Sequence, residues 1–122
     1  MAAGDLAEVK SYDGAITGMH TAGTTVRLVL ASGNVETFTI SGATNAKLCH
    51  INPSDLSAFW TDNTYIYFGY KNGALYRITI ADPDGAETQL AKFNCAINAI
   101  AITGTTLYVA LDNGDLYSYA LA

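Results

Sequence analysis

Three glycine-centred turns recur at an almost constant interval along this chain of 122 residues. They are Ser32-Gly33-Asn34, Asn72-Gly73-Ala74 and Asn113-Gly114-Asp115, so their glycines stand 40 and 41 residues apart. Aligned on these glycines, three 25-residue segments match without a gap, at 16–40, 56–80 and 97–121. A repeat of this period indicates supersecondary units that each bury an apolar face against the next unit.

Each 25-residue unit has the pattern of three antiparallel strands. It opens on an apolar residue, which is Ile16, Leu56 or Ile97, and after a short polar turn continues with a run of alternating apolar residues. The alternation resumes after the glycine-centred turn. A period of two predicts strands, and Asn-Gly supplies the positive φ values that a tight hairpin requires.

A fourth strand is predicted just before each unit. The segments at 46–51 and 89–94 alternate apolar with polar residues, and the segment at 7–12 stands in the same place ahead of the first unit. The order along the chain is therefore an outer strand followed by three strands, repeated three times. No helix of consequence is predicted.

A four-stranded antiparallel sheet repeated about every 40 residues resembles a blade of the β-propeller superfamily. The phrase Leu107-Tyr108-Val109-Ala110-Leu111, followed by Gly114-Asp115-Leu116-Tyr117-Ser118-Tyr119, is similar to the generic LYVA…DGxLYxY blade. The paired motifs of WD and kelch repeats are absent from the sequence. The resemblance covers almost the whole chain and implies an all-β fold of three four-stranded blades in one domain.

Three blades are fewer than the usual four to eight of a closed propeller. An open set would expose an apolar blade face at each end, which soluble monomers avoid. We therefore expect a homodimer that closes a six-bladed ring, in which strand 7–12 pairs with the partner's strand near 115–121. The alternatives are a nine-bladed trimer and a fragment of a longer propeller.

The charge of the chain argues against nucleic-acid partners. Six Lys and Arg against eleven Asp and Glu leave a net charge of −5, and the basic residues are scattered. Half of the residues are hydrophobic and 14% are charged, as in a globular domain. We predict no signal peptide, no transmembrane segment and no membrane insertion, and the compartment stays open.

Side chains capable of catalysis or metal binding are few. His20 and His50 fall on different predicted strands without a nucleophile or a metal-ligand spacing. Cys49 and Cys95 are interpreted as small apolar residues, with one disulfide left open. The segment 82–87 is interpreted as a turn rather than a calcium loop. No cofactor and no metal site are predicted.

The resemblance implies that ligands gather at the mouth of the central channel, where loops between strands meet. The polar groups there are neutral or acidic, which suits hydrogen bonding to a glycan or a peptide. The candidate ligand-binding residues are Tyr12, Asp13, Asn52, Asp55, Trp60, Lys71, Asn72, Asn94, Asp112 and Asn113.

Three function classes follow. The favoured one is a non-catalytic binding or assembly module, with a composition that would suit a secreted or virion surface protein. The second is a propeller lectin with few sugar sites. The number of sites is small because the aligned position of Trp60 is His20 and Ala101 in the other units, so no sugar-binding residue set repeats in every blade. The third is a metal-dependent six-bladed hydrolase or lactonase, to which Asp55 and Asn98 would contribute ligands.

Overall fold

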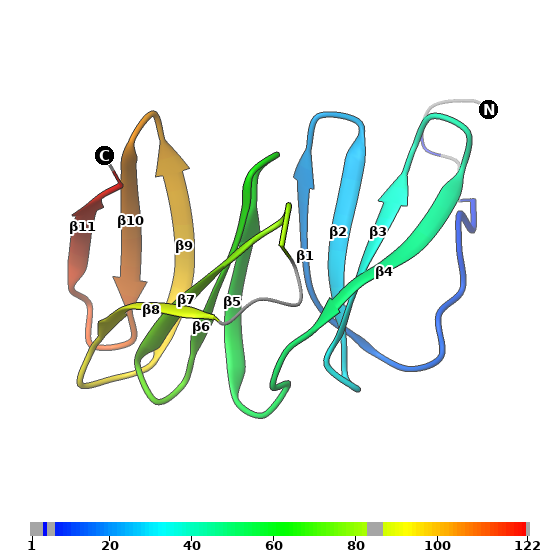
Figure 1. The fold of residues 1–122 in the computed structure, drawn as a ribbon. Helices are drawn as coiled ribbons and strands as arrows, with labels where there is room; N and C mark the ends of the chain where they lie inside the picture. The colour runs from blue at the N-terminus through cyan, green and yellow to red at the C-terminus, as the bar shows by residue number, and fades with distance from the viewer. Residues whose placement is uncertain (1–3, 5–6, 83–86, 122) are drawn as a thin grey trace.

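The computed structural model describes residues 4, 7–82 and 87–121, and within these residues it is built from strands alone (Figure 1). The strands form three antiparallel sheets, which confirms the predicted all-β architecture of successive blades. The first blade has the order β1-β2-β3-β4. Its strands are β1 (Ile16–Ala22), β2 (Thr25–Leu30), β3 (Asn34–Thr39) and β4 (Thr44–His50).

The second and third blades repeat this meander. The second has the order β5-β6-β7-β8, with strands β5 (Leu56–Thr61), β6 (Tyr65–Tyr70), β7 (Ala74–Thr79) and β8 (Thr88–Lys92). The third consists, within the described residues, of β9 (Ile97–Thr103), β10 (Thr106–Leu111) and β11 (Leu116–Ala120). The outer strands expected near 46–51 and 89–94 thus correspond to β4 and β8.

The segment at 7–12 forms no strand in the single chain. A strand needs a neighbour to complete its hydrogen-bond ladder. The neighbour expected for this segment is β11, and in this chain β11 lies at the opposite end of the molecule (Figure 1). The turn expected at 82–87 falls largely on residues 83–86, which lie outside the described residues.

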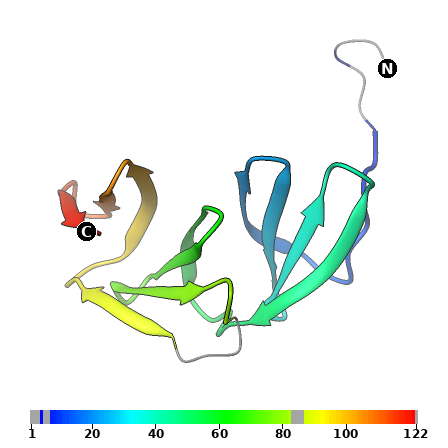
Figure 2. The same cartoon turned by 45° about the horizontal axis from the view of Figure 1, so that its top comes forward.

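The inner strands β1, β5 and β9 lie side by side, and the three sheets fan outward from them (Figure 2). Each inner strand has a bulge near its start, where it pairs with the end of the second strand of its sheet. The register shifts between Ile16 and Gly18, between Leu56 and Ala58, and opposite Ala110 and Leu111. The repeat therefore extends to the irregularities of the sheets, which re-aim one side chain per blade.

Two apolar cores lie between the blades. The first joins residues such as Val29, Val35 and Cys49 of the first blade to Ile66 and Phe68 of the second. Each large apolar side chain buried in this way stabilises the fold by about 1.5–3 kcal/mol. The blades approach closely enough that a Cβ on Gly18 would lie 3.1 Å from the Phe59 Cβ.

The second core joins the second blade to the third. Tyr67, Leu75 and Ala58 pack there against Ile97 and Leu107, while Cys95 borders this core. The two cysteines therefore belong to different cores. The side chain of Tyr67 is buried between blades, whereas the tyrosines of β11 are exposed.

The glycine-centred turns hold the outer strands in place. Gly33 and Gly73 have φ values of 95° and 90°, and a Cβ on either would collide with the backbone oxygen of Ile51 or Phe93. The same residues are hydrogen-bonded to the turn, since the Ile51 and Phe93 amides each donate to the glycine carbonyl at 2.8 Å. Glycine is required at these positions by both the backbone conformation and the close approach.

Candidate functional site

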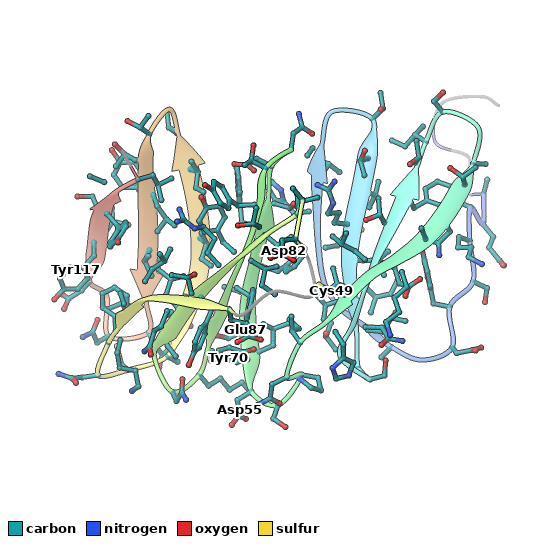
Figure 3. All side chains as sticks on the ribbon, in the orientation of Figure 1. Cys49, Asp55, Tyr70, Asp82, Glu87 and Tyr117 are labelled. Carbon is teal, nitrogen blue, oxygen red and sulfur yellow. The ribbon has the colours of Figure 1, made fainter. Side chains whose placement is uncertain are left out.

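The loops predicted to form the channel mouth meet at one end of the sheets. In each blade the loop that leads into the inner strand accepts a hydrogen bond from the turn after the second strand. The Lys71 amide donates to the Asp55 carbonyl at 2.8 Å, and the Asp112 amide donates to the Ala96 carbonyl at 3.0 Å. In Figure 3, Asp55 lies at the lower edge of the molecule, where these loops gather.

Three of the predicted residues line one pocket of about 200 Å³, which we name the second-blade pocket. They are Asn52, Asp55 and Asn72, and they lie with Tyr70 and Glu87 (Figure 3). The side-chain oxygens of both asparagines cap local turns, accepting from the amides two residues further along the chain at 3.0 and 2.9 Å. Their NH₂ groups therefore remain to donate to a ligand.

Tyr70, Tyr76 and Glu87 also line the second-blade pocket, although they were not among the candidate ligand-binding residues predicted from the sequence. The Tyr70 hydroxyl donates to the Asn52 carbonyl at 3.0 Å. Burial raises the pKa of Tyr70 far above its ordinary value, and the nearby Glu87 carboxylate raises it further. Burial also raises the pKa of Glu87. The pocket thus combines two carboxylates, of which Glu87 is partly desolvated, with two phenols and two amides.

Tyr12 and Asp13 line a separate pocket of about 350 Å³, the first-blade pocket. A hydrogen-bond chain crosses it, from the Tyr12 hydroxyl to Asn45 Oδ1 at 2.6 Å and from Asn45 Nδ2 to Glu36 Oε1 at 2.9 Å. Glu36 is buried. Burial raises the pKa of Tyr12, and the Glu36 charge adds to this effect. Lys10 lies over the Tyr12 ring, 5.5 Å from its centroid.

A third hollow, of about 250 Å³, lies along the inner strands. It is lined by one polar side chain from the second position of each inner strand, namely Thr17, Ser57 and Asn98. Thr17 and Ser57 bind backbone carbonyls, and Asn98 Nδ2 donates to Asp112 Oδ1 at 3.3 Å. Asp55 and Asn98, the two residues considered for a metal, thus line different hollows.

Trp60 lies apart from the mouth pockets, between the first and second blades. Its ring lies 4.6 Å from the ring of His20 and 6.1 Å from the ring of Tyr67. The His20 Nδ1 atom is 3.1 Å from the Thr61 carbonyl oxygen, and the buried Arg27 donates to the Thr61 hydroxyl at 3.0 Å. Trp60 therefore belongs to a polar and aromatic contact between blades.

The remaining predicted residues line none of the three hollows just described. Lys71, Asn94, Asp112 and Asn113 are all exposed. The Asn113 side-chain oxygen accepts from the Asp115 amide at 2.9 Å, so it stabilises its own turn. These four side chains are exposed to solvent and do not lie together in a pocket.

One outer face of the first blade is open and apolar, and we name it the amino-terminal face. A hollow of about 580 Å³ lies on this face. Ile16, Met19 and Ile40 line this hollow and are 50%, 61% and 57% exposed. Val9, in the segment ahead of β1, also lies there. Apolar groups of this size at neighbouring positions mark an interaction surface.

The opposite outer face, on the third blade, is the carboxy-terminal face. Leu116 of β11 is 68% exposed, and Tyr108 of β10 is 40% exposed. No fourth strand covers the edge of β11 within the described residues. At Gly114, whose φ is 92°, a Cβ would meet no described atom within 4 Å, so the place that the outer strand takes in the other blades is open here.

The part of the chain that the structure describes holds no group of three or more His, Cys, Asp or Glu arranged to bind a metal ion. Among the same residues, no helix is long and apolar enough to cross a membrane.

No model of a known protein family and no curated protein matches this sequence. Solved structures do resemble it. The computationally designed protein Ika4 is 10% identical with a TM-score of 0.62, covering 99% of this chain and 100% of its own. BamB from Moraxella catarrhalis is 20% identical with a TM-score of 0.62, and the match covers 82% of this chain and 30% of BamB.

The designed protein Ika8 is 13% identical with a TM-score of 0.66, and the match covers 87% of this chain and 33% of Ika8. The chain therefore spans about a third of the length of Ika8 and of BamB, and the full length of Ika4. At these identities the similarity concerns the fold alone, and the particular blade phrase found in the sequence has no family match. The chain has a propeller-like fold of three consecutive blades.

Proposed function

We propose that this protein is a non-catalytic assembly and binding module in which two copies close a six-bladed ring. The carboxy-terminal face of each copy would cover the amino-terminal face of the other. The observation that carries this proposal is that the same repeat positions are buried inside the chain and exposed at its two ends.

The carboxy-terminal face repeats positions that neighbouring blades cover elsewhere. Leu116 corresponds to Leu75 and Val35, and both of these are 0% exposed. Tyr108 corresponds to Tyr67, which is 1% exposed. In the chain, Leu75 and Tyr67 are covered by the next blade. A following blade placed in the same way would therefore bury the exposed positions of the third blade.

The amino-terminal face supports the same conclusion from the other side. Ile16 corresponds to Ile97, which is fully buried against the second blade, and Met19 corresponds to the buried Ile100. Ile97 and Ile100 are covered by the face of the second blade that carries Leu75 and Tyr67. The same face of the third blade is the carboxy-terminal face, which is open. Each end of the chain thus carries the surface that covers the other end, so a second copy is the natural occupant of both.

The segment at 7–12 would complete the partner's third blade. In the first two blades, the residue after the outer strand hydrogen-bonds the glycine of the turn, as Ile51 does with Gly33. Gly114 has the same positive φ and open space where that residue would lie. Residues 7–12 precede β1 as β8 precedes β9, and they lie beside the face on which the partner would dock.

Two copies satisfy the size range of propellers, because two sets of three blades make six. Each copy would use both of its faces, so no apolar face would remain exposed. Ligand binding would take place at the mouth, where the first-blade and second-blade pockets open.

Native mass spectrometry of the full chain at micromolar concentration tests the assembly. We expect twice the mass of the chain. Met19→Asp should give the mass of one chain, because burying an unpaired carboxylate in an apolar interface costs several kcal/mol. Asn63→Asp, which adds the same charge at an exposed turn, should leave the dimer intact. A monomeric mass for the wild type, or a dimer that survives Met19→Asp, would contradict the proposal.

A further inference from the structure

The two mouth pockets occupy the same place in successive blades. Each is formed by the loop that leads into the inner strand, the turn after the second strand, and the start of the outer strand. Ser32 and Asn72 occupy the same position of this turn, one residue before its glycine.

The strand pairing shows which further residues correspond. Glu36 of β3 pairs with Lys47, and Tyr76 of β7 pairs with Gln89. Counted from these pairs, Asn45, the second residue of β4, and Glu87, the residue before β8, stand at the same position. The first-blade pocket therefore has Glu36 and Asn45 where the second-blade pocket has Tyr76 and Glu87.

The residue types differ at these positions, but the chemistry of the two pockets is conserved. Each pocket has two carboxylates, which are Asp13 and Glu36 in the first and Asp55 and Glu87 in the second. Each has a tyrosine, which is Tyr12 in the first and Tyr76 in the second, and at least one side-chain amide. At the two corresponding positions, the first pocket has a carboxylate and an amide, whereas the second has a phenol and a carboxylate.

The third blade departs from this arrangement. Tyr117 stands where Glu36 and Tyr76 stand in the other blades, and its ring lies 5.2 Å from the ring of Phe93, in the segment that leads to β9. An aromatic contact therefore takes the place of the polar hollow. This difference makes the third blade an internal control for the first two.

We propose that the first-blade and second-blade pockets each bind one neutral sugar ring, so that the chain has two equivalent glycan sites. The proposal deepens the binding role proposed above. The second-blade pocket does not depend on the dimer, because none of its lining residues lies in the segment at 7–12. A sugar ring offers neighbouring hydroxyls that both donate and accept, together with an apolar face that packs on an aromatic ring.

The donors and acceptors of the pockets match such a ligand. In the second-blade pocket, the NH₂ groups of Asn52 and Asn72 donate while the Glu87 carboxylate accepts. Hydrogen bonds to a charged acceptor are the stronger ones. Tyr76 lines the same pocket and presents both a ring and a hydroxyl.

Charge and size argue against other ligands. A cation common to both pockets is disfavoured because Lys10 lines the first, and an anion is disfavoured by the two carboxylates in each. The volumes of about 200 and 350 Å³ lie at or below the lower end of the roughly 300–1,000 Å³ typical of small-molecule pockets. That size suits a single ring rather than a larger ligand.

Saturation-transfer NMR on the full chain, with a panel of methyl glycosides at about 10 mM each, tests the proposal. We expect at least one glycoside to bind, with two sites per chain by calorimetry. Glu87→Gln should weaken the second site at least tenfold, because the acceptor loses its charge. Tyr76→Phe should weaken it about fivefold, the loss of one neutral hydrogen bond. Glu36→Gln should weaken the first site, and Tyr117→Phe should change neither.

A failure of the sugar sites can be told apart from a failure of the dimer, because the dimer is tested only by measuring its mass. If no glycoside of the panel binds, or if binding is insensitive to Glu87→Gln, Tyr76→Phe and Glu36→Gln together, the sugar sites are refuted. n-Butylammonium chloride serves as a second probe. Binding of this amine without any glycoside, abolished by Glu87→Gln, would assign the second-blade pocket to ammonium groups and overturn the proposal.

Discussion

Truncation of Leu116 gives the sharpest measure of the proposed ring closure. Leu116 is 68% exposed in the single chain, whereas its counterparts Leu75 and Val35 are 0% exposed. Leu116→Ala removes about three methylene equivalents, each worth about 0.8 kcal/mol when buried. About two thirds of that burial would be gained on association, which gives about 1.5 kcal/mol per interface and about 3 kcal/mol for the two interfaces of a dimer.

A loss of about 3 kcal/mol corresponds to a roughly 100-fold increase in the dimer Kd. Sedimentation equilibrium over a series of concentrations measures this constant for the wild type and for Leu116→Ala. Asn63→Ala, at an exposed turn away from both faces, serves as the control and should leave the Kd unchanged. The melting temperature of the dissociated chain should also stay unchanged, since the leucine side chain is largely exposed there. A Kd that differs by less than about threefold between wild type and Leu116→Ala would refute the proposed contact.

Three further predictions concern stability. Gly73→Ala should destabilise the fold by more than about 3 kcal/mol in urea unfolding, because its Cβ would collide with the carbonyl oxygen of the residue after the outer strand. Gly114→Ala in the dissociated chain should cost only the roughly 1–2 kcal/mol that a positive φ imposes on alanine. Equal losses would contradict this reasoning. The raised pKa of Tyr70 predicts that its contribution to the free energy of unfolding is fully present below pH 10 and is lost as the pH rises through that pKa. Thermal melts at several pH values should therefore show a smaller alkaline loss of stability for Tyr70→Phe than for the wild type. Arg27→Met should cost about 2 kcal/mol by urea unfolding, because the Asp62 carbonyl loses a charged donor at 2.7 Å, and a neutral effect would show that water replaces it.

Part of the mouth could be predicted from the sequence because its residues stand in turns. Asn52, Asp55 and Asn72 are polar residues beside predicted strand ends, and such residues lie at the surface. Glu36 and Tyr76 stand in strands, and Asn45 and Glu87 stand where an outer strand begins, so periodicity alone gave no reason to select them. Their shared place in the pockets appears only from the pairing between strands, which brings residues of adjacent strands together.

Trp60 shows what packing between blades adds. It was a candidate for a ligand contact by its residue type and inner-strand position, and the packing of the first two blades places its ring 4.6 Å from the ring of His20. Which face of a strand meets a neighbouring sheet depends on how the sheets are stacked, and no local pattern encodes that stacking.

The sequence by itself determined the number of blades, their order and the alternation of their strands, because period-two alternation and glycine turns are local properties of the backbone. It also predicted an outer strand at 7–12 ahead of the first blade, and this segment forms no strand in the single chain. Only the tertiary structure decided which apolar faces are covered and which are open, and which polar groups share a pocket. Burial and hydrogen bonding across sheets depend on residues distant in the chain, so the two open faces and the two matched pockets became visible only once the blades were packed.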